Sequence, residues 1–172
     1  MRFFYDCEFI EDGRTIDLLS LGMVTETGEE LYVVSTECDI SRANPWVQRN
    51  VLPKLPNPSD NAWCDRRGMR NRITSFWKQH NDGNPMELWA WVAAYDHVAL
   101  CQLWGDMAAL PHGVPRFTYE MKQYWMHAGQ PGIPGKPAGA HDALVDARWD
   151  RARFLAIQRA LRSEERRVGK EC

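Results

Sequence analysis

Apolar and polar positions alternate over the first third of the chain in a pattern typical of β-strands. Three apolar runs are separated by the polar turn segments EDG and TGEE, and they cover residues 2–10, 15–25 and 30–37. Because short turns of this kind join neighbouring antiparallel strands, the pattern predicts a meander of three strands.

The middle of the chain changes to loop, helix and strand. Residues 44–61 contain four prolines and predict a loop with at most one helical turn. Residues 65–80 follow a helical period. The apolar residues on one face of that helix are Met69, Ile73, Phe76 and Trp77. Residues 86–93 are apolar almost throughout, which predicts a strand near the centre of the sheet.

Helical patterns dominate the rest of the chain, over residues 95–105, 118–129 and 141–161. The core residues expected in the first of these helices are Val98, Leu100, Cys101 and Leu103. The Gly/Pro-rich residues 130–140 predict an irregular loop, and Asp142 is a natural N-cap for the last helix. Strands followed by alternating helices and a further strand predict an α/β fold with a mixed sheet.

The composition is that of a soluble globular protein. The chain has 172 residues, of which 44% are hydrophobic and 26% charged, so it is long enough for one domain with a substantial core. No apolar run reaches the roughly 18–20 residues that span a membrane, and acidic residues interrupt the N-terminal apolar segment, which argues against a signal peptide. The five cysteines have no C-x-x-C spacing, so we expect free thiols in a reducing cytoplasm.

The formal net charge is −2. Such a chain is not a basic nucleic-acid binder by bulk charge, and a polyanionic substrate would need bound metal ions or a local basic patch.

The last eleven residues differ from the rest of the chain. Their sequence, RSEERRVGKEC, resembles the translation of a common sequencing-adapter DNA. We therefore predict a single domain over residues 1–161 and regard residues 162–172 as an artefactual tail.

Two acidic residues lie within the first predicted strand. Side chains alternate along a strand, so Asp6 and Glu8 point to one face and Cys7 to the other. Two neighbouring carboxylates repel each other, and burial increases that cost. A divalent cation that prefers oxygen ligands, Mg²⁺ or Mn²⁺, would remove the repulsion. The alternative is an edge strand whose acidic face is exposed to solvent.

Two further segments carry residues that could join this site. Asp96 follows the apolar strand over residues 86–93, and strand ends are where sheet proteins commonly place ligands. His141 precedes Asp146 by five residues, and the two side chains can converge if His141 lies in the loop and Asp146 in the helix after it. The alternatives are structural: Asp96 and His141 as helix caps, and Asp146 on a solvated helix face.

These residues, in this order, resemble the DEDDh family of 3′–5′ exonucleases. The motifs that carry the resemblance are Asp6-Cys7-Glu8, Tyr95-Asp96, and His141 with Asp146. The resemblance spans residues 1–161. It is closest to the small actinobacterial and phage polyadenylate-specific (RNase AS-like) exoribonucleases, through segments such as ELWAWVAAYDHVALCQLWG and HDALVDAR. Many DEDDh enzymes have an Asn four or five residues before the second-motif Asp, whereas Trp91 and Val92 stand at those positions here.

The resemblance implies a fold, a cofactor and a substrate. The fold would be ribonuclease-H-like, a mixed sheet with helices on both faces. The chemistry would be two-metal hydrolysis by two Mg²⁺ or Mn²⁺ ions about 4 Å apart, one activating water and the other stabilising the leaving 3′ oxygen. The metal ligands would be Asp6, Glu8, Asp96 and Asp146. His141 would be the general base that takes the proton of water, and the two cations would let an acidic protein bind single-stranded RNA.

Other residues could also touch the substrate. The aromatic residues that could stack on unpaired bases, or belong to the core, are Phe9, Trp91 and Tyr95. The basic cluster that could hold the RNA backbone, or form a solvated helix face, is Arg66, Arg67, Arg70, Arg72 and Lys78. The loop over residues 130–140 could close over the substrate or serve as a connector. His97 belongs to no motif, and we expect it to be structural.

We therefore expect a cytoplasmic, metal-dependent 3′–5′ exoribonuclease that favours single-stranded RNA with 3′ adenylates and has no membrane partner. The nearest alternative is a 3′–5′ DNA exonuclease of the proofreading type, because the same metal site serves both. A remoter alternative is a catalytically inactive ribonuclease-H-like nucleic-acid-binding module, against which the five intact motif positions argue. The sequence leaves open whether the chain is a monomer or a homodimer.

Overall fold

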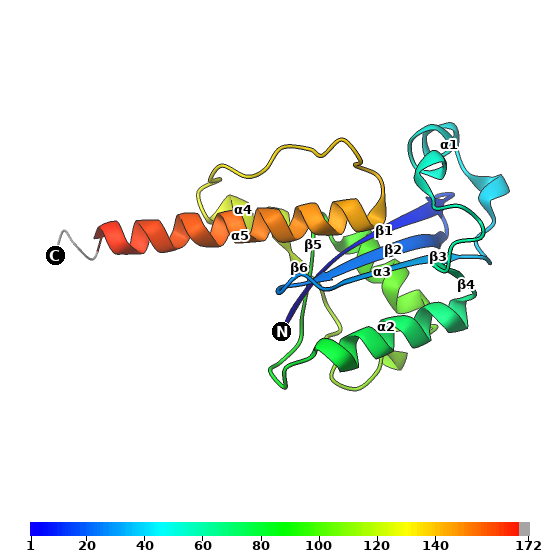
Figure 1. Ribbon diagram of the computed structural model, residues 1–172, viewed down its shortest axis with the longest axis horizontal. Helices are drawn as coiled ribbons and strands as arrows, with labels where there is room; N and C mark the ends of the chain where they lie inside the picture. The colour runs from blue at the N-terminus through cyan, green and yellow to red at the C-terminus, as the bar shows by residue number, and fades with distance from the viewer. Residues whose placement is uncertain (169–172) are drawn as a thin grey trace.

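The structure, a computed structural model, describes residues 1–168, and a mixed sheet of six strands forms the centre of that part of the chain (Figure 1). The strands are β1 (Arg2–Glu11), β2 (Ile16–Thr25), β3 (Glu30–Ser35), β4 (Trp63–Cys64), β5 (Glu87–Ala90) and β6 (Tyr119–Glu120). Their order across the sheet is β4-β3-β2-β1-β5-β6. β1, β2 and β3 form the predicted antiparallel meander, whereas β4, β5 and β6 pair in parallel with their neighbours. The predicted mixed sheet is therefore confirmed.

Helices cover both faces of this sheet. The α-helices in the described part of the chain are α1 (Pro45–Asn50), α2 (Arg66–His80), α3 (Ala94–Gln102), α4 (Met121–His127) and α5 (Ala143–Val168). α5 lies along one face, and α2 and α3 pack on the other (Figure 1). This arrangement agrees with the expected ribonuclease-H-like α/β fold. The proline-rich segment is more helical than the predicted single turn at most, because it contains the six-residue helix α1 and a 3₁₀-helix over Leu52–Lys54.

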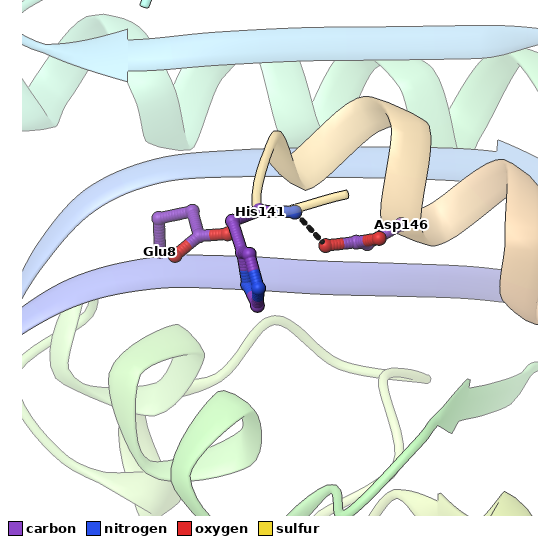
Figure 2. Close-up of side chains that lie close together, drawn as sticks. All are labelled: Glu8, His141 and Asp146. Carbon is purple, nitrogen blue, oxygen red and sulfur yellow. Dashed lines mark hydrogen bonds between the residues drawn. The ribbon is translucent and has the colours of Figure 1, made fainter. Parts of the chain in front are cut away.

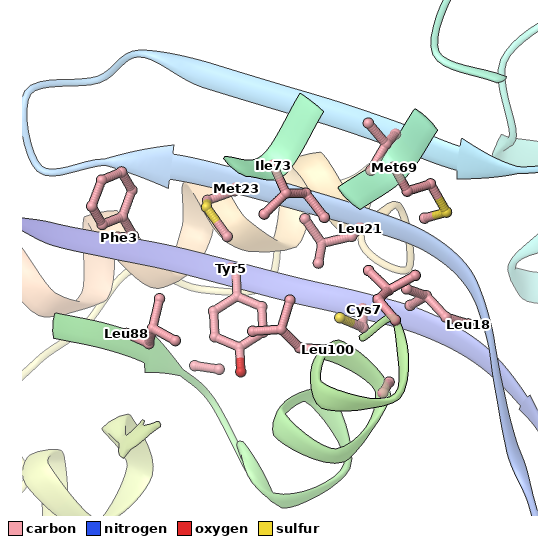
Figure 3. Packing of buried hydrophobic residues seen from close by; sticks show 14 of the residues in the cluster. Phe3, Tyr5, Cys7, Leu18, Leu21, Met23, Met69, Ile73, Leu88 and Leu100 are labelled. Atoms are coloured by element: carbon pink, nitrogen blue, oxygen red, sulfur yellow. The ribbon is translucent and has the colours of Figure 1, made fainter. Parts of the chain in front are cut away.

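β1 divides its side chains between the two faces. The β1 residues in the larger core, formed with α2 and α3, are Phe3, Tyr5 and Cys7 (Figure 3). Phe4 packs on the other face, where its ring centroid lies 5.1 Å from that of Phe154 in α5. By the alternation of a strand, Asp6 and Glu8 belong to the face that α5 covers.

The helices confirm most of the predicted core. α2 buries all four of the residues predicted for its apolar face, and Leu100, Cys101 and Leu103 are buried as well. The prediction for Val98 is wrong, because its side chain is 44% exposed. Val98 lies three residues after the exposed Tyr95, so the two share the solvent-facing side of α3.

The strand predicted over residues 86–93 ends early, at Ala90. Val92 has a φ of 60°, and a branched residue in this left-handed conformation cannot continue a pleated strand. β4 and β6 were not predicted, because a run of two residues has no readable period. The helix predicted over residues 118–129 consequently begins later, at Met121, after β6.

The last helix begins as predicted. Asp142 Oδ1 accepts hydrogen bonds from the backbone N–H groups of Leu144 at 2.9 Å and Val145 at 3.0 Å, which is the geometry of an N-cap. The helix continues beyond residue 161 to Val168. Whether residues 162–172 are artefactual stays a prediction, and residues 169–172 lie outside the described part.

No helix among the described residues has the length and apolar character needed to cross a membrane. The free cysteines are Cys7, Cys38, Cys64 and Cys101, while Cys172 lies outside the described residues.

Candidate active site

The five motif residues line one cavity of about 300 Å³: Asp6, Glu8, Asp96, His141 and Asp146. β1, the first turn of α3 and the segment that begins α5 supply these side chains. Two of the three aromatic residues considered for base stacking, Phe9 and Tyr95, line the same cavity. Trp91 does not line it.

β1 presents its two acidic residues through strand geometry and a bulge. Asp6 lies opposite Gly22 of β2, and Glu8 lies opposite Ser20. The register shifts between Glu8 and Phe9, which marks a β-bulge. Bulges re-aim side chains, and this one explains how Glu8 and Phe9, which strict alternation would separate, line one cavity.

Helix α5 approaches the sheet over a glycine. A Cβ built at Gly22 would lie 2.3 Å from the carbonyl oxygen of Ala143 and 2.3 Å from the backbone nitrogen of Leu144. The absence of a side chain at Gly22 therefore lets the first turn of α5 lie directly on β2. Because Gly22 is opposite Asp6, this contact brings Asp146, in the same first turn, to the carboxylates of β1.

Asp96 is held by β1 and by the turn that precedes it. Its Oδ1 accepts a hydrogen bond from the backbone N–H of Cys7 at 2.8 Å, and its side chain is buried. The carboxylate of Glu120 accepts from the backbone N–H groups of Val92 at 2.9 Å and Ala93 at 2.8 Å. Glu120 thus fixes the left-handed turn from which α3 starts.

His141 lies where residues 130–140, which we call the strap, meet α5. Its φ is 71°, and its backbone N–H donates to Asp146 Oδ2 at 2.6 Å (Figure 2). The Lys54 ammonium donates to the carbonyl of Ala140, and the Trp46 ring meets the imidazole with centroids 4.8 Å apart. These contacts hold a left-handed conformation that costs a non-glycine residue about 1–2 kcal/mol.

The surroundings of His141 favour the neutral form of its imidazole. Lys136 Nζ lies 2.8 Å from His141 Nε2, and since an ammonium can only donate, Nε2 must be the acceptor. Burial, followed by the charge of Lys136, lowers the pKa of His141 from its ordinary 6.5. A ring that is unprotonated at neutral pH is in the state that a general base requires.

Burial and mutual repulsion favour protons on the carboxyl groups of the cavity. Burial, and then the charges of Asp96 and Glu8, raise the pKa of Asp6 well above its ordinary range. Burial and repulsion by Asp146 raise the pKa of Glu8 to about 8, and burial raises the pKa of Asp96 to about 7. These groups therefore need added positive charge before they can all ionise near neutral pH.

The donor atoms fit a divalent cation. One ligand atom each of Glu8, His141 and Asp146 lies within 4.8 Å of the others (Figure 2). This group does not include Asp6 or Asp96, which line the same cavity. Asp146 Oδ1 is buried and has no hydrogen-bond partner among the described residues, and a cation would satisfy it. Clustered carboxylate oxygens suit Mg²⁺ and Mn²⁺.

The basic cluster of α2 makes mainly structural contacts. Arg66 and Arg70 donate to the backbone carbonyls of Gln102 and Leu103 at the end of α3. Arg72 donates to a backbone carbonyl in the loop before α2. For these three arginines the contacts favour a structural role over one in binding an RNA backbone.

His97 also has structural partners, as expected. Its Nδ1 lies 3.0 Å from Thr118 Oγ1, and its Nε2 lies 3.4 Å from the sulfur of Cys101.

Three charged residues close to the site were not predicted: Lys54, Lys136 and Asp150. Asp150 lies one helical turn after Asp146 on α5, a spacing that places both on one face and could have indicated it. Lys54 ends a short 3₁₀-helix and Lys136 lies in the strap. Both segments are rich in proline and have no sequence period that indicates which way a side chain points.

Comparison with known proteins gives the family. A family model described as "3'-5' exoribonuclease Rv2179c-like domain" matches residues 1–158. Two curated proteins of Mycobacterium tuberculosis, 3'-5' exoribonuclease Rv2179c of strain H37Rv and 3'-5' exoribonuclease MT2234.1 of strain CDC 1551, are each 56% identical to the chain over 158 residues. These alignments cover 91% of this chain and 93% of each relative. The chain therefore belongs to the Rv2179c-like family of 3'-5' exoribonuclease domains.

Proposed function

We propose that this protein is a metal-dependent 3′–5′ exoribonuclease that shortens single-stranded RNA in the cytoplasm and prefers adenylates at the 3′ end. The family and the activity for which its two relatives are named support the general reaction. The arrangement of the cavity supports the chemistry.

One observation supports the metal dependence: the buried Asp146 Oδ1 has no hydrogen-bond partner among the described residues, in a cavity that is also lined by Asp6, Glu8, Glu11 and Asp96. The residues that would hold two Mg²⁺ or Mn²⁺ ions are Asp6, Glu8, Asp96 and Asp146. When bound, such cations polarise the scissile phosphodiester and make a bound water more acidic.

His141 is the general base of this proposal. It accepts the proton of the attacking water at Nε2 after the Lys136 ammonium has moved away from that atom. The freed ammonium then adds positive charge beside a phosphate group in the cavity. Burial and the charge of Lys136 lower the pKa of His141, which favours the unprotonated ring that this step requires.

Tyr95 is the proposed stacking platform for the 3′-terminal base. Its side chain is 48% exposed, and its ring stacks on Phe9 with centroids 5.7 Å apart and 14° between the planes. Both residues line the cavity, and aromatic faces stack unpaired bases. A paired end would have to fray before its terminal phosphate could reach the buried carboxylates, so single strands are favoured.

The preference for adenylates rests on the resemblance to polyadenylate-specific exoribonucleases. Stacking favours purines, but it does not separate adenine from guanine.

The test compares labelled RNAs of equal length that end in tails of A, G, C or U, and a DNA of matched sequence, with Mg²⁺ and with EDTA. We expect stepwise shortening from the 3′ end, fastest for the A tail and absent in EDTA. The matched control is Asp6→Asn, which keeps the shape of the side chain but removes a metal-binding charge. Equal rates for the four tails would reject the adenylate preference alone, and faster loss of DNA would favour a DNA exonuclease.

A further inference from the structure

Arg153 is a buried cation beside the site but outside it. Its side chain is only 7% exposed, and it donates to Asp150 Oδ1 at 2.8 Å. Asp150 is buried as well, and neither residue lines the cavity. Apolar residues of similar volume often replace such a buried pair without loss of stability, so stability alone is a weak reason for its presence.

Two tryptophans pack on the guanidinium group. Its Cζ lies 3.3 Å from the ring centroid of Trp149 and 4.1 Å from that of Trp91. The Trp125 ring lies next to Trp91, with centroids 5.9 Å apart. Arg153 Nε has no hydrogen-bond partner among the described residues, so the aromatic rings and Asp150 orient the group.

The outer tryptophans of this cluster hold the strap. Trp125 Nε1 donates to the carbonyl of Pro131, and Trp149 Nε1 donates to the carbonyl of Pro134, each at 2.8 Å. The strap has no regular secondary structure and runs beside α5 to its beginning, where His141 lies (Figure 1). These two hydrogen bonds from indole N–H groups hold the first half of the strap, which forms no helix or strand.

Asp150 connects the same cluster to the other side of the cavity. Its Oδ2 accepts a hydrogen bond from the backbone N–H of Trp91 at 3.0 Å. Trp91 begins the turn between β5 and α3, and Asp96 follows in the first turn of α3. One ion pair therefore joins the turn that carries Asp96 to the strap that leads to His141.

We propose that Arg153 is a positioning residue, which aligns His141 with Asp96 by binding Asp150 and both tryptophans. The inference rests on the proposed exoribonuclease activity. Its effect on the rate is indirect, since no member of the cluster lines the cavity. A misplacement of about 1 Å in a catalytic group can lower a rate about 100-fold.

The experiment replaces the cation in two ways, in the full-length protein. Arg153→Met removes the charge and keeps the length of the side chain. Arg153→Met alone leaves the buried Asp150 carboxylate without its cation. The double variant Asp150→Asn with Arg153→Met removes that charge as well, and the amide oxygen can still accept the hydrogen bond from the backbone N–H of Trp91. With Mg²⁺ and single-stranded RNA, we expect kcat to fall about 10- to 100-fold and KM to change less than about threefold. Hydrogen exchange of the strap should become faster in both variants.

Arg2→Met is the matched control. Arg2 also lies over an aromatic ring of α5, with Cζ 5.2 Å from the centroid of Phe154, and it pairs with Glu26 and Glu87. This variant should lose stability but keep the wild-type kcat and strap exchange. A second arm, Trp125→Phe with Trp149→Phe, removes both indole donors and keeps aromatic rings; it should also lower kcat and loosen the strap.

The outcomes separate positioning from stability and from the proposed function. Wild-type kcat in the Arg153 variants, or an equal loss in Arg2→Met, would overturn the role of Arg153. If Arg153→Met fails to fold, the double variant and the tryptophan pair decide the matter. If the wild-type protein does not hydrolyse RNA, the proposed function fails. The positioning role is then tested by hydrogen exchange of the strap and by the Mn²⁺ affinity measured by calorimetry. Unchanged values of both in the Arg153 variants would then overturn it.

Discussion

Gly22 and Ala143 are in direct backbone contact, because a Cβ at Gly22 would lie 2.3 Å from the carbonyl oxygen of Ala143. We predict that Gly22→Ala pushes the first turn of α5 away from β2. The free energy of unfolding should fall by about 1–3 kcal/mol, the usual cost of overpacking. RNA hydrolysis should fall as well, since Asp146 lies in the displaced turn. Chemical denaturation and a rate assay measure the two effects.

Gly132→Ala is the control for stability, because a Cβ there meets nothing within 4 Å. If both glycine variants unfold at the same denaturant concentration as the wild-type protein, the close approach of α5 does not matter for folding.

Asp6→Asn should abolish hydrolysis and leave the fold intact. The amide keeps the shape of the side chain, but it removes one of the charges proposed to hold metal. Because burial, and then repulsion by Asp96 and Glu8, raise the pKa of Asp6, the metal-free variant should also be more stable than the wild-type protein at pH 8. Wild-type digestion by the purified variant would contradict the site assignment.

The stability of the metal-free protein should fall as the pH rises from about 5 to 8. The pKa of Glu8 is about 8 in the folded protein against an ordinary 4.5, and that of Asp96 is about 7 against 3.8. Between these values the folded chain binds protons that the unfolded chain has lost, so raising the pH favours unfolding. Mg²⁺ or Mn²⁺ should therefore raise the melting temperature more at pH 8 than at pH 5. An equal metal effect at both pH values would argue against the cavity carboxylates as ligands.

His141→Ala should lower kcat by about 10²- to 10⁴-fold, the usual contribution of a general base. Mn²⁺ affinity should change far less, which calorimetry can measure. If His141→Ala hydrolyses RNA at the wild-type rate between pH 6 and pH 8, His141 has only a structural role at the start of α5.

Lys136→Gln should shift the acid limb of the pH–rate profile to higher pH. The charge of Lys136 lowers the pKa of His141, so its removal raises that pKa and protonates the base at a pH where the wild-type ring is still neutral. The pH dependence of kcat/KM from pH 5 to pH 8, which reports the pKa values of the free enzyme, measures the shift. A shift to lower pH, or none, would show that the ammonium does not face the catalytic imidazole in solution.

The motif residues could be predicted from the sequence because they obey local rules. Strand alternation places Asp6 and Glu8 on one face, and the capping preference of Asp142 fixes where the last helix begins. His141 consequently falls just before the helix and Asp146 within it. Local rules do not predict that these three segments meet in space. That prediction came from the order of the three motifs, which resembles that of a known family.

The contacts that support these residues could not be predicted, because they join segments remote in sequence. Lys54 donates to the carbonyl of Ala140, and Trp46 contacts His141, from the proline-rich segment around α1, which has no readable period. Trp91 was considered for base stacking because it is near Asp96 in the sequence. The early end of β5 and the left-handed turn after it leave the Trp91 ring against Arg153 instead.

The proposed metal ligands come from both ends of the domain, Asp6 from the first strand and Asp146 from the last helix. A chain emerging from the ribosome folds from its N-terminal side while the rest is still being made. Until α5 has been synthesised, such a chain has the acidic pair of β1 but neither His141 nor Asp146. By the proposed assignment the site is complete only after α5 has been synthesised, so we expect the unfinished chain to leave the messenger and ribosomal RNA around it intact.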